Sequence, residues 1–377
     1  MNLIFFLGIV SLFADITYEG ARSVIGQYLF VLGSSSLFVG FIAGFGEFIG
    51  YFLRILFGYL ADKTRNYWSF MIIGYSLNVL SVPLLAFTDN YIIAGILVLL
   101  ERLGKAIRTP SRDTIISFIG SKYGYGISFG IHEFLDQIGA LSGPLLIFVI
   151  LSLSKNDYKL GFLILIIPAI LCLIFLLWTK INFSSVREIE VKRKNYESLK
   201  ASKKFWIYTI AIGFVSFGFI DFALISYHYK RINLFEPNVI VILYSIAMIT
   251  DAIASIILGK LFDKFGIRIL IISVFLTTFS NPLLFFFNEK TLSFLGIVLW
   301  GIGIGSQESI MRAYISNIIK KEERATAFGI FNSIYGFSWF IGSLLIGYLY
   351  SISLVYMVVV SFLFQIFGLL ILLKFML

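Results

Sequence analysis

Long apolar stretches alternate with short polar ones along almost the whole chain. Each stretch reaches the roughly 20 apolar residues that a helix needs to cross the hydrocarbon core of a bilayer. The runs are continuous, without the strict alternation of barrel strands, so they predict helices. The stretches lie at about 2–30, 36–61, 67–88, 91–119, 124–152, 157–179, 204–229, 237–260, 267–287, 292–319, 324–350 and 354–375. The pattern predicts an all-α membrane protein with about twelve transmembrane helices.

One long polar segment interrupts this pattern near the middle of the chain. From Lys180 to Lys204 it holds eight lysines and arginines and three glutamates. We interpret it as a linker between two six-helix bundles. The predicted organisation is an N-terminal bundle at 1–182, a cytoplasmic linker at 183–203 and a C-terminal bundle at 204–377.

Composition and charge support a membrane location. Hydrophobic residues make up 59% of the chain and charged residues only 14%, against about 25% charged residues in soluble domains. The net charge of +9 comes from basic loops on one side of the membrane, so no nucleic-acid partner is expected. If Met1 is cytoplasmic, the inner loops, linker and tail hold eighteen lysines and arginines and the outer loops five. This bias predicts a multi-pass protein of the cell membrane with both termini in the cytoplasm.

The two predicted bundles repeat short motifs about 200 residues apart. Gly58-Tyr-Leu-Ala-Asp62-Lys-Thr-Arg65 follows the second stretch, and Gly259-Lys-Leu-Phe-Asp263-Lys-Phe-Gly-Ile-Arg268 follows the eighth. Phe-Gly-Ile occurs in both the fifth and the eleventh stretch, and Arg112 and Arg312 occupy equivalent points of the fourth and tenth. Such spacing predicts two pseudo-symmetric halves.

The loop after the second stretch resembles the signature loop of the major facilitator superfamily. Gly58 and Asp62 match its glycine and aspartate, and Arg65 keeps its basic character, although Thr64 to Asn66 depart from the usual ending. Gly139-x-x-x-Gly143-Pro144 is similar to the antiporter signature of the fifth helix, without its trailing glycines. The first and fourth stretches resemble a prokaryotic branch of the superfamily. The resemblance implies secondary transport, with Gly58, Asp62, Arg65, Arg112, Gly259, Asp263 and Arg268 as gating residues.

The distribution of buried charge divides the stretches into two groups. The third, sixth, ninth, eleventh and twelfth have no ionisable residue in their apolar cores, whereas the others each have at least one. A charge at the bilayer centre costs about 3 kcal/mol or more, so embedded charges should face a cavity or a partner. We therefore expect the third, sixth, ninth and twelfth helices on the lipid side of each half.

Charged residues of the first helix share one face. Asp15, Glu19 and Arg22 are spaced i, i+4 and i+7. One interpretation is a structural ion pair of Glu19 with Arg22. The other is a proton or substrate site, because a low-dielectric cavity favours the protonated form of a carboxyl group. We expect Asp15 to carry the proton and Glu19–Arg22 to support it.

The fourth helix carries a stripe of charge. Glu101, Lys105, Arg108 and Arg112 are spaced i, i+4, i+7 and i+11. The resemblance implies that Arg108 or Arg112 joins Asp62 in a cytoplasmic gate, whereas a simpler interpretation lets Arg112 extend to the interface. Lys105 and Arg108 lie deeper and could neutralise an anionic substrate.

The fifth helix places His132 and Asp136 one turn apart. This pair could relay protons or hold a metal, or form a simple hydrogen bond. His132-Glu133-Phe-Leu-Asp136 lacks the second histidine of the metalloprotease pattern, so we expect neither a protease nor a resident metal. Gly139, Gly143 and Pro144 are interpreted as helix-packing residues.

Fewer embedded charges are found in the second half. Asp221, Asp251 and Glu308 with Arg312 are the candidates, and Asp251 has no obvious cation nearby in the sequence. We interpret Glu308–Arg312 as a structural pair. Asp251 joins the proton-coupling candidates, which are Asp15, Glu19, Glu101, His132, Asp136 and Asp251. The substrate-cavity candidates are Arg22, Lys105, Arg108, Asp221 and Glu308.

These observations predict a monomeric secondary active transporter that works by alternating access. It should move a small solute together with protons through the lipid bilayer, and it should need no cofactor. The direction is left open, with export as one option. A uniporter and a divalent-metal carrier using His132, Glu133 and Asp136 remain alternatives. A membrane-embedded enzyme or sensor is more distant, because the repeated loop signature suits a pair of gates. No nucleotide-binding loop G-x-x-x-x-G-K-[ST] is found.

Overall fold

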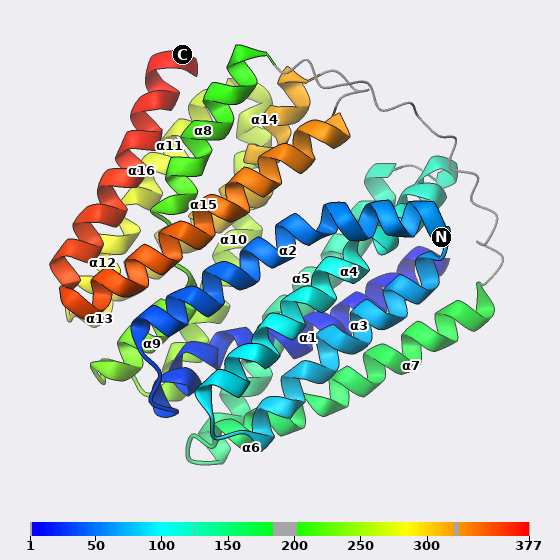
Figure 1. Cartoon of the computed structure of the whole chain (residues 1–377), viewed down its shortest axis with the longest axis horizontal. Helices are drawn as coiled ribbons and strands as arrows, with labels where there is room; N and C mark the ends of the chain where they lie inside the picture. Colours follow the sequence, from blue (N-terminus) through cyan, green and yellow to red (C-terminus); the bar gives the residue numbers. More distant parts are fainter. Residues whose placement is uncertain (1, 124, 184–201, 320–323, 377) are drawn as a thin grey trace. The chain divides into compact units, whose positions relative to one another are not determined.

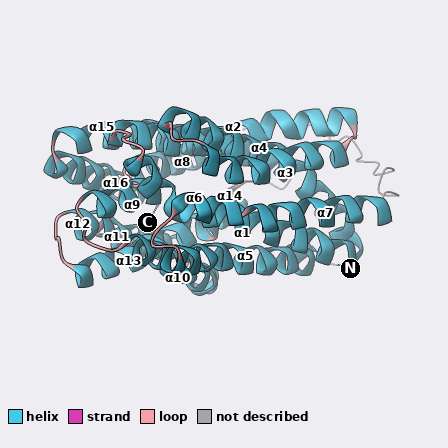
Figure 2. Ribbon diagram, turned by 90° about the horizontal axis from the view of Figure 1, so that it is seen from below, coloured by secondary structure: helices cyan, strands magenta, loops and turns pink. Residues whose placement is uncertain are grey.

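The structure is a computed structural model that describes residues 2–123, 125–183, 202–319 and 324–376. In this part of the chain, helices are joined by short loops and no strand is found (Figure 2). Ten helical segments are long and apolar enough to cross a membrane. Two further segments complete the set: α4, which carries too many charges to count among the ten, and α13 with α14. The predicted all-α fold of about twelve spans is confirmed.

The chain divides into two compact units. The first comprises Met1–Leu32 and Ile49–Arg193, and the second comprises Gly33–Phe48 and Lys194–Leu377. The first part of the second span therefore groups with the C-terminal residues. The predicted linker at 183–203 lies almost entirely outside the described residues, so its role and the exact domain boundaries stay predictions.

Six spans belong wholly or partly to the first unit, and their helices run from blue to green in Figure 1. In chain order the helices are α1 (Asn2–Val31), α2 (Ser36–Thr64, shared with the second unit), α3 (Tyr67–Leu84), the short 3₁₀ turn η1 (Leu85–Phe87), α4 (Tyr91–Tyr123), α5 (Tyr125–Leu153), α6 (Tyr158–Ile164) and α7 (Ile166–Asn182). α1 packs against α5, α7, α3 and α4, and α3 packs along α4. The first helix is thus surrounded by its neighbours, which explains why two thirds of its apolar window is buried.

The second unit repeats this order with more interruptions. Its helices are α8 (Lys203–Phe217), α9 (Phe222–Arg231), α10 (Pro237–Phe265), α11 (Ile267–Thr278), α12 (Ser280–Phe285), α13 (Lys290–Glu308), α14 (Ile310–Ile318), α15 (Arg324–Ile352) and α16 (Leu354–Met376). α8 packs against α15 and α16, and α10 packs along α13. The seventh, ninth and tenth spans each consist of two consecutive helices.

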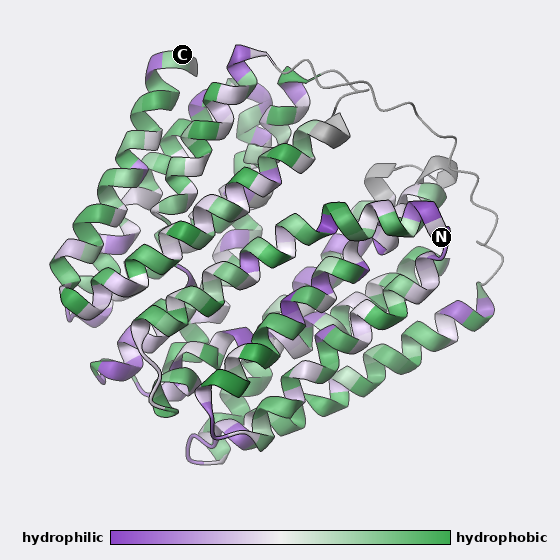
Figure 3. Ribbon diagram, viewed as in Figure 1, coloured by the Kyte–Doolittle hydropathy of each residue, from purple (hydrophilic) through white to green (hydrophobic). Residues whose placement is uncertain are grey.

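Apolar residues cover the exposed faces of α7 and α16 along most of their length (Figure 3). Ile167 and Ile174 of α7 are more than half exposed, as are Tyr356 and Leu363 of α16. A face of this composition is stable against lipid chains and unstable in water. It agrees with the lipid-side position expected for the sixth and twelfth spans. The third span also exposes apolar residues, such as Ile73 at 57% and Leu84 at 50%, while Asn78 of the same helix is buried against α4.

Glycines allow two equivalent helix pairs to approach closely. A Cβ atom at Gly143 of α5 would lie 2.5 Å from the carbonyl oxygen of Ile16 on α1, and a Cβ atom at Gly342 of α15 would meet the backbone of Phe217 on α8. Contacts this short leave no room for a side chain, so backbone packs directly on backbone. The first helix of each half is therefore held against the fifth helix of that half by the same device.

The break in the seventh span is stabilised by side chains from three other helices. The carbonyl of Gly218 accepts hydrogen bonds from Asn281 Nδ2 at 3.0 Å and Gln365 Nε2 at 2.8 Å. Trp300 Nε1 donates to the carbonyl of Ile220 at 2.8 Å, and Asp221 Oδ1 accepts from the backbone N–H of Ala223 at the start of α9. Helix breaks inside a membrane persist only when such partners satisfy the freed backbone groups.

Candidate functional site

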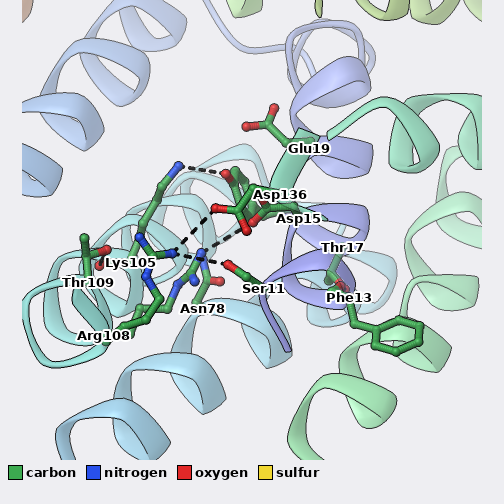
Figure 4. A network of polar contacts seen from close by, with 12 residues as sticks. Ser11, Phe13, Asp15, Thr17, Glu19, Asn78, Lys105, Arg108, Thr109 and Asp136 are labelled. Carbon is green, nitrogen blue, oxygen red and sulfur yellow. Dashed lines mark hydrogen bonds and ion pairs between the residues drawn. The ribbon is translucent and has the colours of Figure 1, made fainter. Parts of the chain in front are cut away.

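The buried charges of the first unit gather between α1, α4 and α5 (Figure 4). Asp15 and Glu19 on α1 are 5% and 6% exposed, and Arg108 on α4 is 1% exposed. Side chains of this kind are almost never buried without partners, because desolvation of a charge costs several kcal/mol. The cluster therefore depends on contacts between helices.

The central contact joins the first and fourth helices. Arg108 Nη2 lies 3.6 Å from Asp15 Oδ1. The distance is that of an ion pair and exceeds that of a hydrogen bond. Within the described part of the chain, Arg108 Nε and Nη1 and Asp15 Oδ1 have no hydrogen-bond partner. Both groups are thus held close by charge while keeping free hydrogen-bonding capacity.

Two tyrosine rings complete the surroundings of Arg108. Its guanidinium lies over the ring of Tyr75 on α3, 4.4 Å from the centroid, and 6.0 Å from the centroid of Tyr18 on α1. Cation–π attraction of this kind is strengthened when water is excluded. The rings hold the guanidinium in place without using its N–H donors.

Lys105 on α4 also contacts Tyr18. Its Nζ donates to the Tyr18 hydroxyl at 2.8 Å and lies 4.2 Å from the ring centroid. Lys105 is partly exposed. No carboxylate of the described residues lies within ion-pair distance of its ammonium group. The nearest partner of Lys105 is therefore the neutral Tyr18 hydroxyl, unlike the other cations of this cluster, which pair with carboxylates.

A second network lies next to the first. His132 Nδ1 is 3.3 Å from Asp136 Oδ2, and Arg112 Nη1 is 3.7 Å from the same oxygen. Arg112 also forms a close pair with Asp113 at 2.9 Å and donates to Ser11 Oγ on α1 at 3.2 Å. The α5 histidine and aspartate therefore connect α5 to α4, and Arg112 connects α4 to α1.

Two further ion pairs lie beside this cluster, one on α1 and one on α4. Glu19 and Arg22 are 3.8 Å apart, which is the structural pair that their spacing predicts. Glu101 Oε2 is 3.3 Å from Arg102 Nε, and Glu101 Oε1 accepts a hydrogen bond from Asn78 Nδ2 at 2.8 Å. A pocket lies beside these pairs, lined by Tyr18, Ala21, Arg22, Ile25, Val82, Leu85, Leu97, Val98, Glu101 and Arg102.

Several members of this site were not among the residues singled out from the sequence. Tyr18, Tyr75, Asn78 and Ser11 carry no net charge, so the search for embedded charge passed over them. Arg102 was missed because it lies beside the Glu101 stripe rather than on it. Helical spacing was the available signal for Ser11 and Tyr18, which lie one turn before and after Asp15 on nearly the same face.

The signature-loop residues are separate from this cluster. Asp62 is exposed, and its Oδ1 accepts a hydrogen bond from the Tyr67 hydroxyl at 3.1 Å. Arg108 and Arg112 are instead directed to Asp15, Asp113 and Asp136. The structure therefore does not bring Asp62 to either arginine, and a gate built from such a pair stays a prediction.

Gly58 packs toward Pro110 of α4, since a Cβ atom at Gly58 would lie 3.5 Å from the Cβ atom of Pro110. Arg65 is exposed, as are Asp263 and Arg268, and Gly259 has open space beside it.

In the second unit, two candidates have structural contacts. Asp221 caps α9. Asp251 on α10 is 3% exposed and accepts a hydrogen bond from Ser255 Oγ, which also donates to the carbonyl of Gly305. The side chains of Glu308 and Arg312 lie outside the described part of the structure, so their pairing stays a prediction.

Nothing in the described residues resembles a metal site. No group of three histidine, cysteine, aspartate or glutamate side chains is found there that could hold an ion. Glu133 is exposed, and its carboxylate accepts a hydrogen bond from Gln137. It therefore does not join His132 and Asp136 as a third ligand.

Comparison with known proteins assigns the family. The Major Facilitator Superfamily model matches residues 4–235 and 222–377. The chain belongs to this superfamily. An uncharacterized protein of Mycobacterium tuberculosis is 34% identical over 363 residues, covering 94% of this chain and 88% of the relative. An uncharacterized transporter of the superfamily from Methanocaldococcus jannaschii is 30% identical over 358 residues, covering 93% and 89%.

Solved transporters have the same fold. The nucleoside transporter NupG matches with a TM-score of 0.74 and 18% identity over 100% of this chain and 98% of its own. A bacterial homologue of the human lysosomal transporter Spinster, in an inward-facing and occupied conformation, matches with a TM-score of 0.71 and 16% identity, over 99% of this chain and 96% of that one. At these identities the likeness shows the fold alone. Together with the family assignment, it makes this superfamily member a multi-pass membrane transporter that works by alternating access, and not an enzyme.

Proposed function

We propose that this chain couples the movement of a small solute to protons, and that Asp15 carries the proton. The observation that carries the proposal is the buried Asp15–Arg108 pair across α1 and α4. A carboxylate that is held by charge alone, with a free oxygen lone pair, can change partner without dismantling a hydrogen-bond network. An embedded carboxylate beside a cation is also the arrangement that proton relays in transporters use.

Neighbouring groups support a role for Asp15 over the other candidates. Asp136, Arg108, Lys105 and Glu19 all act electrostatically on Asp15. Asp136 already has His132 and Arg112 as partners, and Glu19 has Arg22. Asp15 therefore depends on Arg108, so an event at Arg108 changes its charge state first. We also propose that the protein lies in the cell membrane with both termini in the cytoplasm, because most of its loop lysines and arginines would then be on the inner side.

The proposal is tested in proteoliposomes that contain a trapped pH indicator. A panel of organic acids, nucleosides, peptides and sugars is added outside, and solute-dependent proton flux is recorded. Asp15→Asn should abolish this flux for an active solute and should preserve exchange of labelled solute at equal pH. Asp89→Asn is the matched control, because this carboxylate is 80% exposed and pairs with Lys159 at the surface.

Two outcomes would contradict the assignment. Proton flux that survives Asp15→Asn would move the coupling role to His132 and Asp136. Solute exchange without any proton flux in the wild-type protein would favour a uniporter. Glu19→Gln should instead lower the yield of folded protein, because it leaves the half-buried Arg22 with less charge compensation.

A further inference from the structure

The charges around Tyr18 define which solute the site can take. We infer that the substrate is an organic monoanion whose carboxylate binds Lys105 and Arg108, and that it displaces Asp15 from Arg108 as it binds. This inference rests on the proposed function, because it assumes that Asp15 exchanges a proton during transport.

Lys105 and Arg108 form a pair of cationic groups on one side of the cluster. They lie at i and i+3 on α4, and both border the ring of Tyr18. Lys105 contributes a positive charge that no described carboxylate compensates at ion-pair distance. Arg108, 99% buried, presents Nε and Nη1 without hydrogen-bond partners. A carboxylate is the group that a guanidinium fork with two free N–H donors binds best.

Charge balance favours one negative charge on the ligand. Without ligand, Asp15, Arg108 and Lys105 together carry one positive charge. When a monoanion binds the two cations and Asp15 takes up a proton, the sum is again one positive charge. A neutral solute with a proton would raise the buried charge by one unit, and a dianion would lower it by one unit. The extra positive charge adds a desolvation penalty of several kcal/mol, and the second anionic group of a dianion would have to be desolvated as well; the monoanion avoids both costs.

The same geometry explains how binding and protonation are linked. Arg108 holds Asp15 by charge alone at 3.6 Å, so an incoming carboxylate that forms hydrogen bonds with Nε and Nη1 competes with it directly. The other groups that act on Asp15 are Lys105 from α4, Asp136 from α5 and Glu19 on α1 itself. Lys105 would be neutralised by the ligand, and the two carboxylates repel a charged Asp15. The aspartate that loses its cation therefore binds a proton.

The test uses purified full-length protein in weakly buffered detergent solution. Acetate, lactate and benzoate are titrated, with acetamide, lactamide and benzamide as neutral analogues of the same shape and inorganic phosphate as a second anion. Thermal stability reports binding, and a pH dye reports proton uptake. At least one monocarboxylate should stabilise the wild-type protein, and the protein should take up about one proton for each anion that binds. The corresponding amide should neither stabilise the protein nor cause proton uptake.

Variants separate the roles of the three groups. Lys105→Met should raise the Kd of the active carboxylate by about tenfold or more. Lys374→Met is the control, because Lys374 is exposed on α16 and lies over the ring of Phe375 at 5.2 Å. Asp15→Asn should retain binding and lose proton uptake. This last result distinguishes competition for Arg108 from a merely structural role of Asp15.

The inference is overturned if no monocarboxylate binds, if phosphate or the neutral amide binds as well, or if Lys105→Met leaves the affinity unchanged. Its failure is distinct from that of the proposed function. If a neutral solute drives proton flux in vesicles, the proposed anion site is contradicted, whereas proton-coupled transport is supported. If a carboxylate binds as described but never crosses the vesicle membrane, the anion site is supported and the proposed transport of this solute is contradicted.

Discussion

The energy of the Asp15–Arg108 pair is measurable by a double-mutant cycle. At 3.6 Å and an effective dielectric constant near 20, two unit charges attract by about 5 kcal/mol before desolvation is subtracted. The contact lacks hydrogen-bond geometry, and Asp136 repels Asp15. We therefore expect a coupling energy of about 1–2 kcal/mol, within the range found for residues in direct contact.

The single variants should differ in a defined order. Arg108→Met leaves Asp15 buried without its cation and should lower the free energy of unfolding by about 3 kcal/mol or more. Asp15→Asn leaves Arg108 between two tyrosine rings and also removes the repulsion from Asp136, so it should cost less, about 1–2 kcal/mol. The double variant should be about as stable as Arg108→Met alone, because loss of the unpaired carboxylate offsets the cost of the second substitution.

Unfolding in mixed detergent–SDS micelles gives the four free energies of the cycle. The exposed pair Asp89–Lys159 provides the control cycle: its atoms are closer, at 2.6 Å, but the side chains are 80% and 45% exposed. Surface pairs contribute about 0–1 kcal/mol at most. A coupling energy for Asp15 and Arg108 no larger than that of the control pair would refute the reasoning that burial, rather than distance, gives the pair its strength.

Two packing predictions follow from contacts outside the charge cluster. Gly143→Ala places a Cβ atom 2.5 Å from the carbonyl oxygen of Ile16 and should destabilise the protein by about 1–3 kcal/mol. Gly50→Ala is the control and should be neutral or slightly stabilising, because its Cβ atom would have nothing within 4 Å. Equal unfolding midpoints of the two variants would contradict the close approach of α1 and α5. Trp300→Phe removes the hydrogen bond to Ile220 and should cost about 1–3 kcal/mol. Trp339→Phe should cost less, because its buried Nε1 has no partner among the described residues; the reverse order of midpoints would show that the break in the seventh span does not depend on Trp300.

The sequence predicted the spans and the charged positions well, because both depend on local patterns. Apolar runs of membrane length specify helices directly, and i, i+3 and i, i+4 spacing gave the Glu19–Arg22 and His132–Asp136 pairs that the structure contains. The partner of Asp15 was beyond this reasoning. Arg108 lies 93 positions away on another helix, and only the packing of α1 against α4 brings the two together.

Interruptions of the spans were also beyond prediction from the pattern. The stretch around 204–229 is apolar apart from a few residues such as Asp221, so its mean hydropathy gives no sign that the helix stops at Phe217 and restarts at Phe222. The break is stable because Asn281, Trp300 and Gln365 provide donors from other helices. No window of sequence around Gly218 contains this information.

The internal repeat preserves the scaffold and changes the chemistry. Gly143 and Gly342, about 200 positions apart, perform the same close packing in both halves. In the second half, the tenth and eleventh spans are joined by a neutral hydrogen bond, which the Tyr335 hydroxyl donates to Gln307 Oε1. A neutral pair has a fixed partner at any pH, whereas Asp15, Arg108 and Asp136 carry charges that can be exchanged. The close packing is therefore common to both halves, whereas the buried charge cluster on which our proposal rests lies in the first half.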